Sequence, residues 1–323
     1  MRTLAVFLIG ACIGSPAIAQ ESLEAPREVR IALLLADLSA VHDADQSFSA
    51  DVLMAASWRD PALAGGSNEV RNLDLADVWH PTLLIYNRRA VTESLPSTVT
   101  VQPDGTVTYL QRFTGDFSAR LDLREFPLDS HEFYVWVVSP ARVGTPGTLV
   151  PETNIAALRN QDLSVSDWII GEATLTSEAF RMAPGAPENS GVKLTVPATR
   201  RVTYYTIQVL IPLVAIVLMA YTVFWVAPTV IPTRVGVVVT TMLTLIAYRF
   251  MLANHVPRLS YLTRLDWFML GATVLVILTL FAMAGTAYLM SRERQTVVQK
   301  IDRIGRLLYP IVFVGYSLIV WLG

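Results

Sequence analysis

A stripe of residues within an apolar segment carries the clearest chemical pattern in the sequence. Its spacing of 4, 3, 4, 3 and 4 places the members on one face of a helix, and they are Gly236, Thr240, Leu243, Ala247, Phe250 and Asn254. Threonine hydroxyls can hydrate ions, whereas a ring of Leu243 or Phe250 side chains can close a conduit by excluding water. The stripe therefore predicts a helix that faces water inside a membrane.

A simpler interpretation of the same residues is helix packing. Small and hydroxylated residues are common where membrane helices touch, so Thr240 and Thr241 could simply contact their neighbours. The water-facing interpretation also carries a condition, because one helix cannot enclose a conduit. It requires several copies of the chain in a symmetric ring.

No arrangement of residues typical of an enzyme accompanies this stripe. The four histidines, His42, His80, His131 and His255, show no metal-ligand spacing and are expected to lie in loops or on the surface. The sequence has no G-x-S-x-G, H-E-x-x-H or phosphate-binding loop. We therefore expect no catalytic residues, no metal site and no cofactor.

Composition argues against a soluble enzyme and against a disordered chain. Of its 323 residues 53% are hydrophobic and only 16% are charged, against about 25% charged in soluble domains. The net charge of −2 hides a split: residues 20–203 hold 15 Lys/Arg and 24 Asp/Glu, whereas residues 204–323 hold 9 and 3. A soluble enzyme and a disordered chain are thereby excluded. No basic run suggests binding to nucleic acid.

The first 19 residues are typical of a secretory signal peptide. Arg2 precedes an apolar run, and Ala17-Ile18-Ala19 forms the cleavage pattern. The chain's only cysteine, Cys12, lies in this segment. A lipoprotein site around Cys12 is the less favoured alternative, since the apolar run before it is short. We expect an exported chain without disulfides.

Hydropathy predicts four membrane-spanning helices, since about 20 apolar residues cross a bilayer. They cover residues 205–226, 235–253, 267–290 and 307–322. Residues 291–306 carry five basic side chains and are predicted to form a short cytoplasmic loop. The export signal and this loop agree, so residues 20–200 and the C-terminus are expected in the periplasm and residues 201–323 in the inner membrane of a bacterium.

Residues 20–200 contain short strand-like runs separated by turn residues. Examples are residues 27–35, 132–138 and 192–196, and the runs 97–101 and 106–110 flank Pro103-Asp104-Gly105, a hairpin signal. Many short strands of this kind predict an antiparallel β-sandwich. The fold class is then an extracellular β-sandwich followed by a four-helix transmembrane bundle.

Five short motifs follow one another along these two parts. They are Trp58-Arg59-Asp60; residues 78–87 (VWHPTLLIYN); Phe126-Pro127-Leu128-Asp129 within residues 119–133; Arg200, twelve residues before Pro212; and residues 232–244 (PTRVGVVVTTMLT) followed by residues 256–259. In this order they resemble the prokaryotic pentameric ligand-gated ion channels of the Cys-loop receptor superfamily. Ala119 and Phe133 stand where animal receptors have the two bracketing cysteines.

The resemblance implies a homopentamer in membrane lipid, with permeant ions in a central pore and a small-molecule or ionic agonist between adjacent sandwiches. It assigns aromatic faces of the agonist pocket to Trp58, Tyr86 and Phe180, which suit cationic ligands. The sequence departs from the family at Ser139, where a central tryptophan is expected. Arginines such as Arg112 and Arg181 could instead serve an anionic ligand.

The resemblance also implies a junction that couples the sandwich to the pore. Its expected members are Asp43, Asp45, Phe126, Pro127, Asp129, Arg200, Pro257 and Arg258. Opposite charges among them are expected to form partly buried pairs whose rearrangement accompanies opening. As an alternative, Asp129 could do no more than cap its own turn.

Selectivity is expected to depend on the inner mouth of the pore. Cation channels of the family carry a glutamate just before the basic residue that starts the pore helix, whereas Thr233 stands there, followed by Arg234. The sequence therefore favours anions, such as chloride, although the acidic exported domain would concentrate cations. A cation-selective channel of the same family and a non-conducting membrane-anchored ligand sensor are the alternatives.

Overall fold

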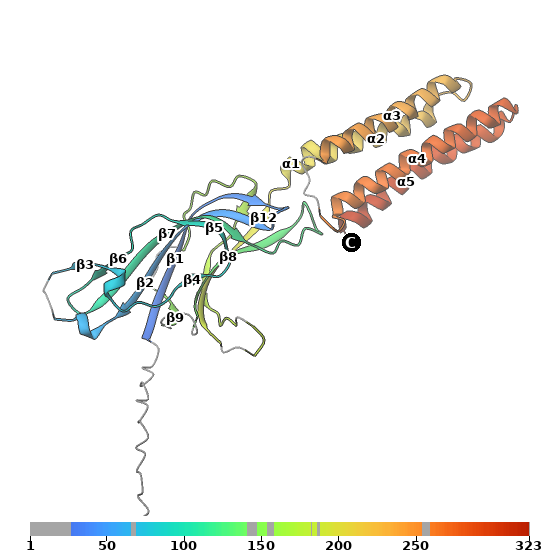
Figure 1. Ribbon diagram of the computed structural model, residues 1–323. Helices are drawn as coiled ribbons and strands as arrows, with labels where there is room; N and C mark the ends of the chain where they lie inside the picture. Colours follow the sequence, from blue (N-terminus) through green and yellow to red (C-terminus); the bar gives the residue numbers. More distant parts are fainter. Residues whose placement is uncertain are drawn as a thin grey trace, which may run out of the picture.

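The computed structural model describes residues 27–65, 69–140, 147–153, 158–181, 183–185, 188–253 and 259–322. A strand-rich part precedes a helical part, and the helices project from one end of the strands (Figure 1). The last strand ends at Arg200 and the first helix begins at Thr203. The predicted signal peptide, Asn254, Pro257 and Arg258 lie outside the described residues.

The larger sheet of the strand-rich part has seven strands. Their order is β3-β6-β7-β2-β1-β9, and β5 also pairs with β7. All described pairs in it are antiparallel except β1 with β9. The strands are β1 (Arg27–His42), β2 (Ser47–Arg59), β3 (Arg71–Asp74), β5 (Arg88–Glu93), β6 (Thr98–Val101), β7 (Thr106–Ser118) and β9 (Gly147–Pro151).

The smaller sheet has five strands in the order β10-β12-β8-β4, with β11 also paired to β12. They are β4 (Leu84–Ile85), β8 (Ser130–Ser139), β10 (Trp168–Ile170), β11 (Thr174–Ser177) and β12 (Ser190–Arg200). The two sheets pack through alternate apolar residues. Phe48 of the larger sheet lies 5.0 Å from Phe133 of the smaller one, ring centre to ring centre. The predicted β-sandwich is thus confirmed.

The turn between β6 and β7 is the hairpin that the sequence indicated. Gly105 has φ +82°, and a Cβ at this position would lie 2.6 Å from the backbone oxygen of Asp60. Only glycine fits such a turn without strain. Short helical turns at Pro61–Leu63 and Leu75–Asp77 complete this end of the domain.

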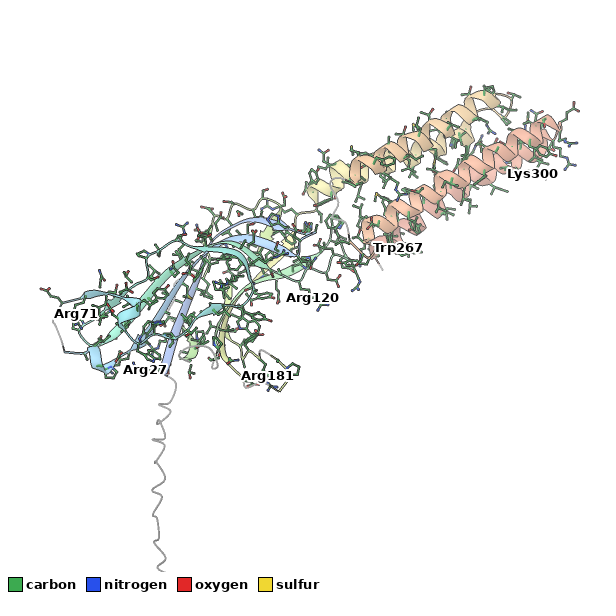
Figure 2. All side chains as sticks on the ribbon, in the orientation of Figure 1. Arg27, Arg71, Arg120, Arg181, Trp267 and Lys300 are labelled. Atoms are coloured by element: carbon green, nitrogen blue, oxygen red, sulfur yellow. The ribbon has the colours of Figure 1, made fainter. Side chains whose placement is uncertain are left out.

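In the part of the chain that the structure describes, four helices are long and apolar enough to cross a membrane. The first, Thr203–Trp225, comprises α1 (Thr203–Tyr205), η3 (Thr206–Leu210), α2 (Ile211–Tyr221) and η4 (Thr222–Trp225), and the others are α3 (Ile231–Leu252), α4 (Arg264–Ser291) and α5 (Gln295–Leu322). The chain ends at the sandwich side of the bundle, and the turn between α4 and α5 lies at the far end (Figure 1). This arrangement places the basic segment, marked by Lys300 in Figure 2, away from the sandwich.

The fourth span begins earlier than the sequence predicted. The expected loop 291–306 shortens to the turn between Ser291 and Gln295, because α5 is already helical from Gln295. Val298 and Asp302 are buried on one face of this extension, while Lys300 and Arg303 are exposed. An amphipathic helix of this kind has too many charges to register as apolar, so hydropathy missed its first three turns.

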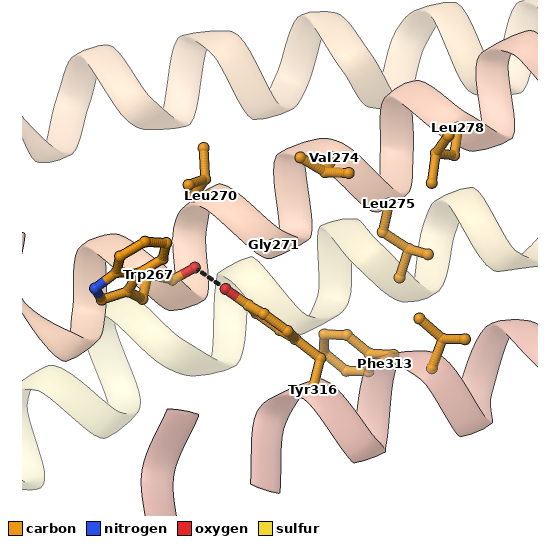
Figure 3. Close-up of a pocket in the computed structure, with 9 residues that line it drawn as sticks. Trp267, Leu270, Gly271, Val274, Leu275, Leu278, Phe313 and Tyr316 are labelled. Atoms are coloured by element: carbon orange, nitrogen blue, oxygen red, sulfur yellow. Dashed lines mark hydrogen bonds between the residues drawn. The ribbon is translucent and has the colours of Figure 1, made fainter. Parts of the chain in front are cut away.

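Helices α4 and α5 enclose an apolar groove on their outer side (Figure 3). The Tyr316 hydroxyl donates to the Trp267 carbonyl at 2.6 Å. A Cβ on Gly271 would lie 2.0 Å from the Tyr316 ring, so the glycine lets this ring pack against α4. Many exposed aliphatic side chains flank the groove, as expected for a surface that faces lipid.

Candidate functional site

Arg200 stands at the centre of an ion network at the junction between sandwich and helices. Its side chain is 4% exposed. Nε donates to Asp129 Oδ1 at 2.9 Å, while Nη2 donates to Asp129 Oδ2 at 3.0 Å and to Asp43 Oδ1 at 2.8 Å. One guanidinium therefore holds two carboxylates, one from the β1–β2 turn and one from the loop before β8. Three residues that the sequence assigned to the junction meet here.

Aromatic rings and a histidine surround this network. The Arg200 guanidinium carbon lies 4.3 Å from the centre of the Trp168 ring and 4.9 Å from that of Phe126. His131 Nε2 lies 2.7 Å from Asp129 Oδ2, and its side chain is 6% exposed. The expectation of a surface or loop position was wrong for His131. His131 lies two residues after Asp129, and side chains two apart in a strand point to the same side. This spacing could have predicted that His131 lies beside Asp129.

The network keeps Asp129 ionised. Burial raises the pKa of its carboxyl, but hydrogen bonds from His131 and Arg200 outweigh burial and hold that pKa below the ordinary value of 3.8. A lowered pKa adds stability that is complete above 3.8 and is lost as the pH falls through the folded value. Asp129 therefore does more than cap its turn, and mild acid leaves it charged.

The loop before β8 connects this network to the helices. Phe126, which precedes Pro127 through a cis peptide bond, packs edge-on against Tyr205 at 4.8 Å between ring centres. The Phe126 carbonyl accepts from the backbone N–H of Leu265 at 3.3 Å. The loop thus touches both the start of the first span and the start of α4.

One expected junction residue, Asp45, contributes less, whereas an unexpected one, Tyr261, takes part. The Asp45 side chain is exposed, and its backbone carbonyl accepts from Arg89 Nη1 at 2.6 Å. Tyr261, which the sequence did not single out, accepts from the Leu123 N–H at 3.0 Å through its hydroxyl oxygen. In the β1–β2 turn it is therefore Asp43, and not Asp45, whose side chain pairs with Arg200.

A second candidate site is an aromatic cluster formed by Tyr86, Trp136 and Phe180. The ring centres lie 4.4 Å apart for Tyr86 and Phe180, 5.3 Å for Tyr86 and Trp136, and 5.2 Å for Trp136 and Phe180. Tyr86 follows β4, Trp136 lies on β8 and Phe180 lies in the β11–β12 hairpin. Sequence reasoning named Tyr86 and Phe180 but missed Trp136, although its place in an alternating strand was visible.

The aromatic cluster already holds a cation from the same chain. The Lys193 ammonium lies 5.5 Å from the centre of the Trp136 ring and 4.8 Å from that of Tyr134. The same ammonium lies 3.1 Å from Glu178 Oε2. An external amine would have to compete with Lys193 for the Trp136 face. The cluster is therefore not an empty cage for a cation.

Two residues proposed for the agonist pocket point into the sandwich. Trp58 is 3% exposed, and its ring lies edge-on to Trp79 with centres 6.0 Å apart. Ser139 is 1% exposed, and its Oγ accepts from the Gly147 N–H at 2.9 Å. Both placements remove these side chains from the aromatic cluster, because inward positions of a strand face the core.

The two arginines proposed for an anionic ligand are exposed but paired. Arg112, on the outer face of the larger sheet, donates through Nε to Asp51 Oδ1 at 2.9 Å. Arg181 donates through Nε to Glu188 Oε1 at 3.0 Å in the β11–β12 hairpin, where Figure 2 marks it. Arg112 and the aromatic cluster belong to different sheets, so within one chain they do not form a single pocket.

The predicted stripe of α3 lies on a face of the helix that is exposed among the described residues. Leu243 is 67% exposed and Phe250 74%. The remaining described members of the stripe, and the expected mouth residue, are exposed as well: Thr233, Gly236, Thr240 and Ala247. The opposite face is buried against the bundle by Arg234, Val238, Thr241, Leu245 and Leu252.

The two neighbouring threonines of α3 have different environments. Thr240 is exposed, whereas Thr241 is buried and its hydroxyl donates to the Val237 carbonyl at 2.8 Å. Packing therefore accounts for Thr241 but not for Thr240.

The structure corrects the sequence-based role of Arg234. We expected this residue near the inner mouth, but it is 2% exposed and faces the bundle. Its Nη2 donates to Asp302 Oδ2 of α5 at 2.5 Å, and its Nε donates to the Val226 carbonyl at 3.1 Å. Its charge is thus paired inside the protein, and the argument for anions that used this charge fails.

Comparisons with known proteins cover both parts of the chain. Residues 16–174 match the neurotransmitter-gated ion-channel ligand binding domain, and residues 209–296 match the neurotransmitter-gated ion-channel transmembrane region. The proton-gated ion channel of Gloeobacter violaceus is 22% identical over 332 residues, which cover 99% of this chain and 92% of that protein.

Two animal receptor subunits are similar over much of the same region. Gamma-aminobutyric acid receptor subunit alpha-4 of Rattus norvegicus is 24% identical over 85% of this chain and 52% of its own length. Subunit alpha-2 of Bos taurus is 24% identical over 82% of this chain and 61% of its own length. This chain therefore spans only about half to three fifths of the length of these two relatives.

Proposed function

The chain belongs to the Cys-loop receptor superfamily of ligand-gated ion channels, and from this premise we propose a homopentamer whose pore is lined by the α3 stripe. The observation that carries the proposal is the exposed face of α3, along which small, hydroxylated and apolar side chains follow one another. Such a graded face has no advantage against lipid, whereas in a ring it provides hydration and a hydrophobic constriction.

Thiol accessibility tests this arrangement directly. Because Cys12 is the chain's only cysteine and lies in the predicted signal peptide, the exported protein offers a background without thiols. With Thr240→Cys, a hydrophilic methanethiosulfonate reagent is expected to block most of the agonist-evoked current, since the exposed residue would face the pore.

Thr241→Cys is the matched control, one residue further on and buried. The same reagent should leave its current unchanged. Equal modification of both variants, or of neither while the channel is open, would contradict a pore lined by the stripe.

The agonist site of the proposed channel is the aromatic cluster together with the outer face of the neighbouring subunit's larger sheet. Tyr86 is 50% exposed and leaves one side of the cluster open. Arg112 lies on the other sheet, so only an adjacent subunit could bring such a side chain to the cluster. Because Lys193 already covers Trp136, the pocket favours an agonist that offers an anionic group.

We propose that the pore selects anions, for a reason that does not involve the charge of Arg234. In the ring, the N-termini of the α3 helices would meet at the inner mouth, where their backbone N–H groups favour negative charge. No carboxylate lies on α3 from Ile231 to Leu252. The acidic outer domain acts in the opposite sense, but it surrounds a wider vestibule and is screened within about 8 Å at physiological salt.

The reversal potential under a chloride gradient distinguishes an anion channel from a cation channel. With a tenfold chloride gradient and equal sodium, the reversal potential is expected to move toward the chloride equilibrium potential by nearly the Nernst limit of 2.303RT/F, ~59 mV per tenfold for one charge. A reversal potential that instead follows a sodium gradient would establish a cation channel.

A further inference from the structure

A buried ion pair links the inner end of α3 to the outermost helix. Both side chains are 3% exposed, with Arg234 on α3 and Asp302 on α5. Residues 204–323 contain only three acidic residues, and Asp266 is used in the N-terminal cap of α4 while Glu293 is exposed in the α4–α5 turn. Of these three acidic side chains, only Asp302 pairs with Arg234, the first basic residue of α3.

The pair is held by few contacts. Arg234 Nη1 and Asp302 Oδ1 are buried without a hydrogen-bond partner in the described residues. Besides the bond to Asp302, the Arg234 guanidinium donates to the Val226 carbonyl, its one other partner among the described residues. A buried guanidinium that loses its only carboxylate has a strong drive to reach water. Thr233 and Pro232, directly before Arg234, are exposed, so the short route to water leads toward the mouth.

We propose that Asp302 is a positioning residue that sets the charge of the inner mouth by keeping Arg234 out of the conduction path. The inference rests on the proposed pore, because it requires the exposed face of α3 to surround water. A residue on a helix that lies outside the pore then determines how easily ions enter from the cytoplasm.

Release of Arg234 has an electrical signature that does not depend on selectivity. A positive ring at the inner mouth draws anions in from the cytoplasm, which enlarges inward current in an anion channel. The same ring repels cations from the cytoplasm, which reduces outward current in a cation channel. Both cases give inward rectification in symmetric solutions, and the effect grows at low ionic strength as screening weakens.

Single-channel recording of Asp302→Asn in symmetric salt tests the proposal. The ratio of inward to outward conductance is expected to rise at least about twofold over the wild type at low salt, and less at high salt. Asp302→Glu keeps the carboxylate and should stay near the wild-type ratio. Glu293→Gln is the matched control, because it removes one negative charge from the same end of the bundle without touching the pair.

The double variant Arg234→Gln with Asp302→Asn separates electrostatics from damage to the fold. It removes both charges and leaves neither one buried alone, so it should restore the wild-type ratio. The double variant also provides a test if Asp302→Asn alone fails to assemble. A changed ratio of inward to outward conductance in the double variant would show that Arg234 already acts on ions in the wild type, which would refute the proposal.

The outcomes separate the two proposals. If Asp302→Asn shows the wild-type ratio while Thr240→Cys is still blocked by the thiol reagent, the role of Asp302 is refuted and the pore stands. If Thr240→Cys is not modified in conducting channels, the pore assignment fails and the inference fails with it.

Discussion

Replacing Arg200 with alanine is expected to remove nearly all agonist-evoked current. The substitution leaves Asp129 and Asp43 without their shared cation, and unpairing a buried ion pair costs about 3–5 kcal/mol. A shift of that size changes the closed–open equilibrium constant by roughly two to three and a half orders of magnitude. Maximal current per channel at the cell surface, with surface protein counted by labelling, is the measurement.

The contrast with the agonist site makes this expectation specific. Phe180→Ala, in the aromatic cluster, should raise the half-maximal agonist concentration while a saturating dose still opens the channel. Arg200→Ala should leave the equilibrium binding of agonist within a few-fold of the wild type and lower the maximum instead. Arg200→Lys keeps the charge but not the two-pronged contact, so it is expected to lie between the two. Unchanged maximal current in Arg200→Ala would remove the ion network from the gating pathway.

Replacing Leu243 with serine is expected to produce current without agonist. Leu243 is 67% exposed at the middle of α3, and a symmetric ring would place one copy from each subunit at one level. Burying a leucine side chain gains roughly 1.5–3 kcal/mol, so even partial loss in every subunit removes several kcal/mol from a dewetted, closed state. Basal open probability should therefore rise by about two orders of magnitude or more.

Leu245→Ser is the control with the same chemical change on the opposite face. Leu245 is fully buried against the bundle. This variant should reduce the amount of assembled protein and should not open the channel. Agonist-free current measured before and after addition of an open-channel blocker distinguishes the two results. A silent Leu243→Ser channel with a normal agonist response would place the constriction elsewhere.

Local patterns explain what the sequence predicted well. Alternation in β1, β7, β8 and β12 and four apolar runs were enough to predict a sandwich followed by four spans, because these periods follow from backbone geometry. The helical stripe of α3 was visible for the same reason. Recognising this stripe requires no knowledge of how the other helices pack.

Contacts between distant elements were harder to predict. The partnership of Arg234 with Asp302 joins residues 68 positions apart, and no local period encodes which helix lies opposite. The aromatic cluster was found only in part, since Trp136 and Lys193 come from two paired strands whose register the sequence left open. The buried position of Trp58, by contrast, could have been predicted from alternation alone. Trp58 lies an even number of residues after Val52, Met54 and Ala56, so it points to the same inner side of the strand.

The position of the C-terminus decides how this protein can be labelled. The carbonyl of Trp321 accepts from Arg264 Nη1 at 2.9 Å, so the last turn of α5 is fastened directly beside the start of α4 and close to the loop that contains Phe126. A fluorescent or affinity tag fused there would crowd the start of α4 and the loop that contains Phe126. The α4–α5 turn, at the other end of the bundle, offers a site for insertion where a fused domain would stand clear of them.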